Sequence, residues 1–112
     1  MPNDNQLMVE QILKVLDEKK ALDPVALDLS EVSESLEFFV IATGTSAPHL
    51  QALERALKEA QKPLAIEGPS QRWLLLNYGP VLVHLMSPEA REYYDLEGLW
   101  ADARRFPMAS SA

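Results

Sequence analysis

The residues best suited to chemistry gather between Tyr78 and Trp100. One histidine, His84, lies inside the apolar run VLVHLM, and the sequence REYYDLEGLW follows a few positions later. This second segment brings together two tyrosines, a tryptophan, an arginine and three carboxylates. Tyrosine, tryptophan and arginine anchor protein–protein contacts more often than other residues do. Because no recognisable catalytic motif accompanies them, the pattern predicts recognition of a partner rather than bond-making.

The chain offers little for a metal or a nucleophile. Its only histidines are His49 and His84, without the HxH or HxxxH spacing of a zinc site, and it has no cysteine. A Gly-x-Ser-x-Gly elbow is also missing. We therefore expect no metal, no cofactor and no enzyme activity. We expect His84 on a sheet face beside Trp73, and His49 exposed in the first turn of a helix.

The turn Gly44-Thr45-Ser46 supports an alternative function. It joins a buried strand to a helix N-terminus, where free N–H groups can bind a phosphate. It lacks the further glycines and the lysine of a P-loop, so a tight turn with a helix cap is the simpler interpretation. Asp28 is the only carboxylate inside a strand, whereas metal-dependent nucleotidyl transfer needs two or three converging acids. The alternative is thus a degenerate nucleotidyltransferase-like, nucleotide-binding protein.

Composition and charge narrow the class of protein. With 112 residues, 47% apolar and 24% charged, the chain fits one soluble globular domain. No secretion signal or membrane span is visible, and the lack of cysteine suits a reducing compartment, so we expect a cytoplasmic protein. The net charge of −7 and the scattered lysines and arginines argue against nucleic-acid binding. Such acidity either attracts a basic protein or only maintains solubility.

Hydrophobic periodicity predicts a single α/β domain built on a mixed sheet of about five strands flanked by helices. Residues 1–103 form the expected domain, and residues 104–112 read as a flexible C-terminal tail. The predicted helices cover residues 5–20, 46–62 and 88–94, with one further turn at 96–100, and the predicted strands cover residues 25–29, 38–42, 64–66, 73–78 and 81–86.

The last two predicted strands form a hairpin with Tyr78-Gly79 as its loop, which places Trp73 opposite His84. Alternation then gives two apolar faces, and both need cover. The first face carries Trp73, Leu75, Leu82, His84 and Met86, and the second carries Leu74, Leu76, Val81, Val83 and Leu85. In the next helix, Tyr93 and Tyr94 point about 100° apart, so one of them should lie at the surface.

Three segments together resemble the ribosomal silencing factor family (RsfS, or Iojap-like). They are FFVIATGTS at 38–46, WLLLNYG at 73–79 running into VLVH at 81–84, and REYYDLEGLW at 91–100. The resemblance covers the chain from about Leu7 to Trp100. It implies a nucleotidyltransferase-like fold without the catalytic acids. One departure is visible at the hairpin turn, where the family usually reads DYGD and this chain reads Asn77-Tyr78-Gly79-Pro80.

The resemblance also implies a function. Such proteins repress translation by binding large-subunit ribosomal protein L-fourteen and blocking subunit joining when nutrients are scarce, and some members are dimers. We expect one hairpin face, or its edge, to meet the partner, while a homodimerisation module is a further alternative. The candidate partner-binding residues are Trp73, Leu75, Asn77, Tyr78, Leu82 and His84, with Glu92, Tyr93 and Asp95 nearby.

Overall fold

The computed structural model describes residues 4–68 and 72–106. Local signals in the sequence explain where the helices begin. Ser46 and Ser87 cap their helices by accepting hydrogen bonds from His49 N–H and Ala90 N–H, and a proline lies in the first turn of each helix. The elements in chain order are α1 (Asp4–Glu18), β1 (Leu22–Asp28), β2 (Phe38–Thr43), α2 (Ala47–Ala60), β3 (Ala65–Glu67), β4 (Trp73–Asn77), β5 (Val81–Met86), α3 (Pro88–Tyr94), α4 (Leu96–Leu99) and β6 (Arg104–Phe106).

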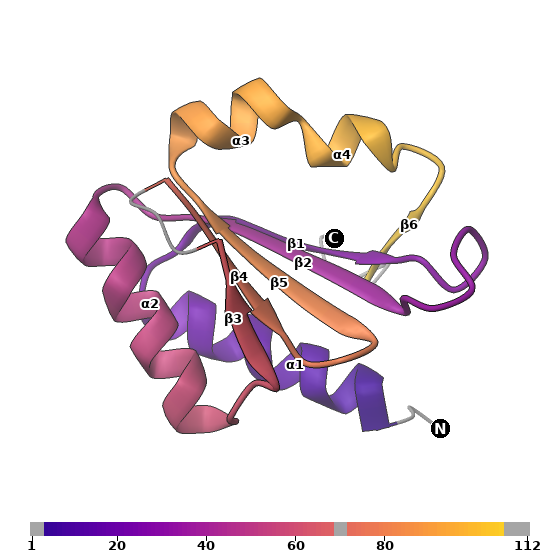
Figure 1. Ribbon diagram of the computed structural model, residues 1–112, viewed down its shortest axis with the longest axis horizontal. Coiled ribbons are helices and arrows are strands. Elements are labelled where there is room, and N and C mark those ends of the chain that lie inside the picture. The colour runs from indigo at the N-terminus through magenta and orange to yellow at the C-terminus, as the bar shows by residue number, and fades with distance from the viewer. Residues whose placement is uncertain (1–3, 69–71, 107–112) are drawn as a thin grey trace.

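The strands form one mixed, six-stranded sheet in the order β3-β4-β5-β2-β1-β6 (Figure 1). The central pair, β2 and β5, is parallel, and the other neighbouring pairs are antiparallel. A parallel pair needs a long crossover, and α2 together with β3 and β4 supplies it. The expected α/β architecture with a mixed sheet is confirmed, with one strand more than the sequence predicted.

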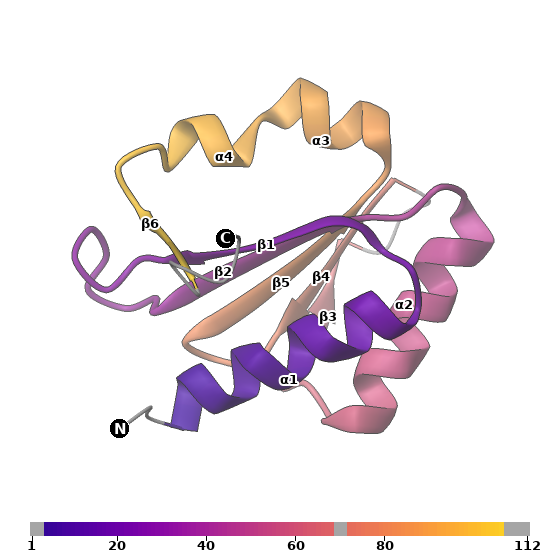
Figure 2. The same cartoon turned by 180° about the vertical axis from the view of Figure 1, so that it is seen from behind.

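One face of the sheet is covered by α1 and α2, which lie side by side beneath it in both views (Figures 1 and 2). This layer holds the larger of the two hydrophobic clusters. It buries the helix positions Val9, Leu16 and Leu53 against strand residues such as Val40 and Val83. Burial of this kind supplies most of the driving force for folding.

The opposite face is covered only in part, by the short helices α3 and α4 (Figure 1). A smaller cluster lies here, in which Leu27, Ile41 and Met86 are buried. The cover passes over β1, β2 and β5 and leaves side chains of β4 only half-buried. The two faces of the sheet are therefore unequal, and one retains accessible apolar surface.

The predicted hairpin register is wrong by two residues. Trp73 pairs with Met86, and His84 pairs with Leu75. The loop is Gly79-Pro80, with Tyr78 N–H donating to the Val81 carbonyl across 2.9 Å. Gly79 has φ +94°, which suits the glycine-first type of two-residue turn, and Pro80 needs no ladder donor at that position. A shift of two leaves every side chain on its predicted face.

The start of the expected C-terminal tail is instead a strand. Residues Arg104–Phe106 form β6, which pairs antiparallel with β1 along Ala26, Leu27 and Asp28. The Phe106 ring packs on that of Phe38, with the ring centroids 5.2 Å apart. The remainder of the expected tail, 107–112, lies outside the described residues.

Candidate functional site

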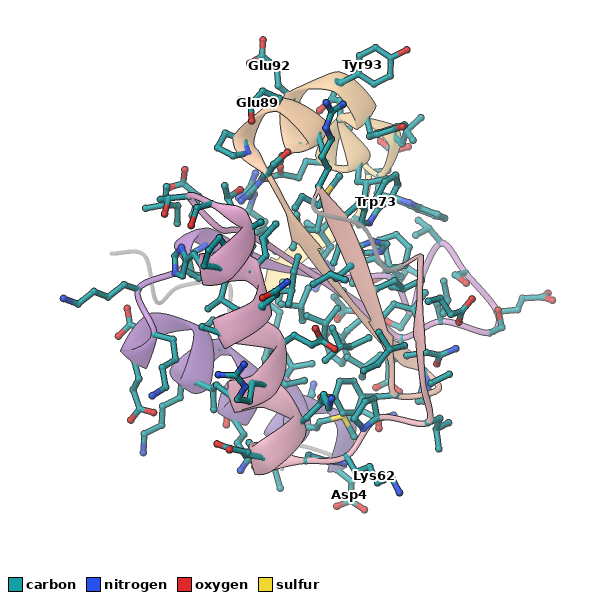
Figure 3. The ribbon with its side chains drawn as sticks, turned by 60° about the vertical axis from the view of Figure 1, so that its left-hand side comes forward. Asp4, Lys62, Trp73, Glu89, Glu92 and Tyr93 are labelled. Carbon is teal, nitrogen blue, oxygen red and sulfur yellow. The ribbon has the colours of Figure 1, made fainter. Side chains whose placement is uncertain are left out.

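Five of the predicted partner-binding residues share the partly covered face of the sheet. Strand alternation places Trp73, Leu75 and Asn77 of β4 there, together with Leu82 and His84 of β5. His84 is buried, and the other four are half-buried. We call this group, together with Tyr93 and Tyr94 of α3, the aromatic face. Figure 3 shows Glu92 and Tyr93 projecting from α3 above Trp73.

Aromatic rings connect α3 to the sheet across this face. The Tyr94 ring lies 4.6 Å from that of Trp73, and the Tyr93 ring stands edge-on to Tyr94 at 5.0 Å. Tyr94 is 48% exposed and Tyr93 is 82% exposed. The expectation that one of the two tyrosines lies at the surface is confirmed. The result is a continuous aromatic surface that runs from half-buried Trp73 to solvent.

His84 holds the indole of Trp73 in place. Trp73 Nε1 donates a hydrogen bond to His84 Nδ1 over 3.0 Å, and the His84 ring meets Phe39 edge-on at 4.7 Å. Among the described residues, Nε2 of His84 has no hydrogen-bond partner. Burial lowers the pKa of His84 to about 4, so the ring is neutral at physiological pH. The expected location of His84 beside Trp73 is confirmed.

A groove of about 820 Å³ opens beside this aromatic surface, between β4 and α3. Its floor includes Trp73 and Leu75, and one wall carries Tyr93 and Tyr94. The sequence did not predict a groove here, because its lining residues come from three separate segments. The polar lining residues are Glu67, Arg72 and Glu89.

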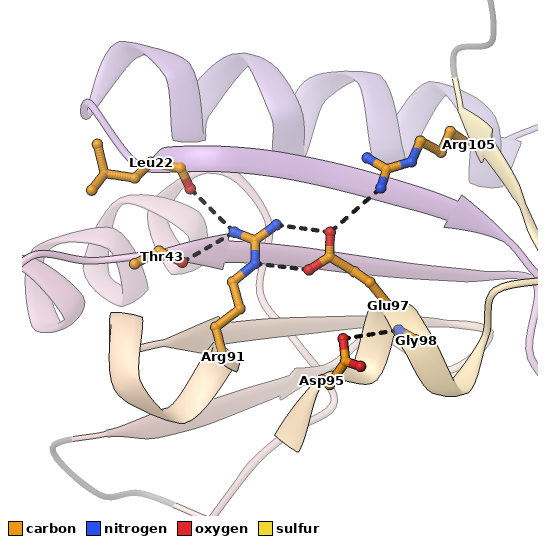
Figure 4. A network of polar contacts seen from close by, with 7 residues as sticks. All are labelled: Leu22, Thr43, Arg91, Asp95, Glu97, Gly98 and Arg105. Atoms are coloured by element: carbon orange, nitrogen blue, oxygen red, sulfur yellow. Dashed lines mark hydrogen bonds and ion pairs between the residues drawn. The ribbon is translucent and has the colours of Figure 1, made fainter. Parts of the chain in front are cut away.

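An arginine clamp fastens α3 and α4 to the sheet (Figure 4). Arg91 Nε and Nη2 donate to the two carboxylate oxygens of Glu97 over 3.0 and 3.2 Å. Its Nη1 donates to the hydroxyl of Thr43 at 3.0 Å and to the carbonyl of Leu22 at 3.4 Å. These hydrogen bonds hold the pKa of the Glu97 carboxyl below its usual range, and the charges of Arg91 and Arg105 add to the effect.

Asp95 joins the two short helices. It has the left-handed backbone angle φ 46°, ends α3, and accepts a hydrogen bond from Gly98 N–H as the cap of α4. A Cβ on Gly98 would lie within 2.2 Å of Asp95 Oδ2. Arg91, Asp95, Glu97 and Gly98 of the REYYDLEGLW segment therefore have structural tasks, while Glu92 and Tyr93 remain exposed.

Tyr78 does not join the aromatic face. It is buried in the cluster between the sheet and the helices α1 and α2, and its hydroxyl donates to the Gln61 carbonyl over 3.1 Å. Burial raises the pKa of Tyr78 to about 12. Asn77 lies at the margin of the face, where its Oδ1 accepts from Gly79 N–H at 2.7 Å and its amide donates to Glu67 at 3.1 Å.

The Gly44-Thr45-Ser46 turn has little left for a phosphate. Gly44 N–H donates to the Met86 carbonyl, and Thr45 N–H donates to Nδ1 of His49 at 2.9 Å. The other ring nitrogen of His49 lies 3.0 Å from the Lys19 carbonyl oxygen, so the histidine links the two long helices rather than projecting into solvent. A side chain on Gly44 would collide with Leu50. These contacts give the turn a structural role.

Asp28, the strand carboxylate of the alternative function, also has a structural role. Asp28 Oδ1 accepts from the backbone and hydroxyl of Ser30, a local turn interaction. No group of three or more histidine, aspartate or glutamate residues in the described part of the chain is arranged to hold a metal. Within the same residues, no helix is both long enough and apolar enough to cross a membrane.

Charge is distributed unequally along the chain. Residues 1–20 and 44–64, which include α1 and α2, contain six acidic and six basic residues and all five lysines. The rest of the chain contains eleven acidic residues and four arginines, so it carries the whole net charge of −7. The aromatic face therefore comes from the part of the chain that carries the net negative charge, and Glu67 and Glu89 lie beside it.

Comparison with known proteins identifies the family. The protein-family model described as "Ribosomal silencing factor during starvation" matches residues 2–111 of this chain. The chain belongs to the ribosomal silencing factor family. The proteins named "Ribosomal silencing factor RsfS" from Halalkalibacterium halodurans and Bacillus subtilis are 37% and 36% identical to it. These matches cover 88% and 84% of this chain and 90% and 88% of the relatives.

Relatives also extend to organelles and to solved structures. The mouse protein named "Mitochondrial assembly of ribosomal large subunit protein 1" is 33% identical, over 82% of this chain and 44% of its own length. The crystal structure of a Chromobacterium violaceum protein has a TM-score of 0.79 at 33% identity, covering 86% of this chain and 85% of that one. These similarities confirm the family and the fold expected from the sequence.

Proposed function

We propose that this silencing factor represses translation by binding large-subunit ribosomal protein L-fourteen and blocking the joining of the small subunit when nutrients are scarce. The proposal rests on family membership and on the resemblance of the three sequence segments. The name of the mouse relative, which refers to the large ribosomal subunit, points to the same subunit. The factor acts in the cytoplasm as a binding protein, without a cofactor and without catalysis.

The observation that supports this function best is the half-covered aromatic face, which comes from the part of the chain that carries the net negative charge. Trp73 and Leu75 are half-buried, and Tyr93 is 82% exposed. Such side chains are typical anchors, and a specific interface needs about 800 Å² from each partner. The negative charge around the face attracts a basic ribosomal protein and speeds its association.

The mechanism is steric. A rigid α/β domain bound to the intersubunit surface of the large subunit occupies volume that the small subunit needs. The Trp73–His84 hydrogen bond and the Arg91–Glu97 clamp keep the aromatic face preformed, which lowers the entropy that ordering would cost on binding. The predicted contact residues that are accessible for this role are Trp73, Leu75, Asn77, Leu82, Glu92, Tyr93 and Asp95, the last of which also caps α4.

Co-sedimentation with separated ribosomal subunits tests the proposal. We expect the protein to pellet with the large subunit alone and to reduce subunit association in a sucrose gradient. A Leu75→Asp variant should pellet at least about tenfold more weakly, because it buries an unpaired charge in the contact. The matched control is Leu7→Asp on α1, where the leucine is 50% exposed on the opposite layer.

Each result has a distinct meaning. If the wild-type protein pellets with neither subunit, the proposed function fails. If Leu75→Asp and Leu7→Asp weaken pelleting equally, binding occurs but not through the aromatic face. Circular dichroism of both variants checks that each remains folded.

We also propose that the free protein forms a homodimer through the same face. The exposed aromatic surface offers apolar area to a second copy, and the ribosome would then compete with that copy. Light scattering over a dilution series measures the mass directly. Leu75→Asp should shift the mass to that of a monomer at concentrations where Leu7→Asp does not. A wild-type monomer at every concentration would contradict the dimer without affecting ribosome binding.

A further inference from the structure

We propose that the groove between β4 and α3 binds a single cationic side chain, an arginine or a lysine, presented by the protein partner. This inference deepens the proposed function and rests on it for the identity of the partner. The groove itself can be tested without a ribosome. Its aromatic walls and its carboxylates carry the argument.

Three aromatic rings line the groove in different orientations. The Trp73 and Tyr94 rings are inclined by 47° with centroids 4.6 Å apart, and Tyr93 stands at 87° to Tyr94. Rings set at angles around one space present several π faces to it. Cations are attracted to such faces, and boxes built from a tryptophan and tyrosines are a recurrent way of binding them.

Two carboxylates from different elements line the same groove. Glu89 lies in the first turn of α3, and Glu67 ends β3, where the amide of Asn77 donates to its Oε2 over 3.1 Å. Arg72 also lines the groove, and its carbonyl accepts a hydrogen bond from Ser87 N–H at the start of α3. Two acids against one guanidinium leave the groove net negative, which disfavours an anionic occupant.

The shape favours a long basic side chain over a small cation. An arginine or lysine stem can pack along Trp73 while its charged head reaches a carboxylate at the margin. A planar guanidinium can stack on an aromatic ring and still pair with a carboxylate, so arginine fits this groove better than lysine. The accessible tyrosine hydroxyls and carboxylates keep the head partly solvated, which limits its desolvation cost.

The direct test titrates the full-length protein with N-acetyl-arginine amide and with N-acetyl-citrulline amide. Citrulline has nearly the same shape without the charge. The indole N–H resonances of Trp73 and Trp100 are followed by NMR. We expect a saturable shift of the Trp73 signal in the millimolar range with arginine and little with citrulline. Trp100 packs on Phe39 outside the groove and should not respond.

Matched variants test whether binding depends on the aromatic ring of Tyr93 or only on the size of its side chain. Tyr93→Leu should weaken arginine binding about two- to fivefold, whereas Tyr93→Phe should retain it, because only the aromatic ring attracts the cation. Glu89→Gln should also weaken it, and Glu59→Gln on α2, outside the groove, should not. The same order is expected when the variants are pelleted with the large subunit.

Several outcomes would overturn the proposal. An equal response to citrulline would show a groove for neutral side chains, and a saturable response only to N-acetyl-glutamate amide would show an anion site at Arg72. No response to any probe would also overturn it, even if the protein still pelleted with the large subunit. Arginine binding by a protein that pellets with neither subunit would refute the proposed function alone.

Discussion

The indole N–H of Trp73 and Nδ1 of His84 form a 3.0 Å hydrogen bond on the face that we propose for docking. An indole N–H only donates, so Nδ1 of the histidine must carry no proton. The neutral ring therefore keeps its proton on Nε2, which is buried and has no partner among the described residues. The orientation of the largest aromatic side chain on this face thus depends on the protonation state of one buried histidine.

This dependence predicts a loss of stability in acid. The folded-state pKa of His84 is about 4, against 6.5 in the unfolded chain, so between these values the unfolded state binds more protons. The free energy of unfolding should fall as the pH drops from 6.5 to 4, by up to about 3 kcal/mol. Urea denaturation across this range measures it.

A His84→Gln variant is the control for the acid effect. Its side-chain oxygen can still accept from Trp73 Nε1, but it does not titrate. We expect the variant to be less stable at pH 7 and to lose stability less steeply below pH 6.5. The histidine is not the source of the acid sensitivity if both proteins follow the same curve.

The clamp between Arg91 and Glu97 predicts a second, separable effect. The Arg91 side chain is 14% exposed and the Glu97 side chain 26%. Arg91→Ala leaves that carboxylate without its main partner and frees α3 and α4 from Thr43, so we expect a loss of about 1–3 kcal/mol. Arg91→Lys should lose part of this, since lysine cannot form the paired contact. Thermal unfolding at pH 7 ranks the three proteins.

The change in this stability difference with pH tests whether the Arg91–Glu97 ion pair is its source. Because the pKa of Glu97 is lowered in the folded state, its contribution is present above the unfolded pKa and is lost as the pH falls through the folded value. Arg91→Ala should therefore be less stable than the wild type at pH 7, with a smaller difference in strong acid. A difference that does not change with pH would mean that packing, not the ion pair, holds the helices.

The alternation of side chains along the strands was the most reliable predictor of this fold. Side chains two residues apart share a sheet face, so Trp73, Leu75 and His84 were placed on the correct face even though the hairpin register was wrong. The loop itself depends on turn chemistry. The glycine-first turn Gly79-Pro80 competes with the equally short alternative one position earlier, and local propensity does not separate them.

That same loop shift explains why Tyr78 was misjudged as a surface candidate. Because the turn is Gly79-Pro80, Tyr78 lies on the same face of the sheet as Leu74 and Leu76. Its side chain therefore enters the core between the sheet and the two long helices. Strand β6 was not predicted, because three residues are too few to show an alternating pattern. Its pairing with β1 also joins distant parts of the chain. The clamp spans six residues across the break at Asp95, a spacing that no single helix would bring together.

Asp95 allows a test of structural against contact roles within the exposed segment. Asp95→Asn retains both the cap and tolerance of a left-handed backbone, so it should change stability by less than about 0.5 kcal/mol. Asp95→Ala loses both and should cost about 1–2 kcal/mol. Urea denaturation measures these changes, and pelleting with the large subunit should stay near wild type for Asp95→Asn. Strong loss of binding by that variant would instead assign the charge to the interface.

Substitutions at Tyr78 and Tyr93 give opposite predictions for stability and for binding. Tyr78→Phe removes a buried hydroxyl that donates to the Gln61 carbonyl, so it should lower stability by about 1 kcal/mol and leave pelleting unchanged. Tyr93→Leu alters a side chain that is 82% exposed, so it should leave stability nearly unchanged and weaken pelleting. Urea denaturation and co-sedimentation of both variants provide the comparison. Weakened pelleting by a fully folded Tyr78→Phe protein would place the docking surface at the hairpin end rather than on the aromatic face.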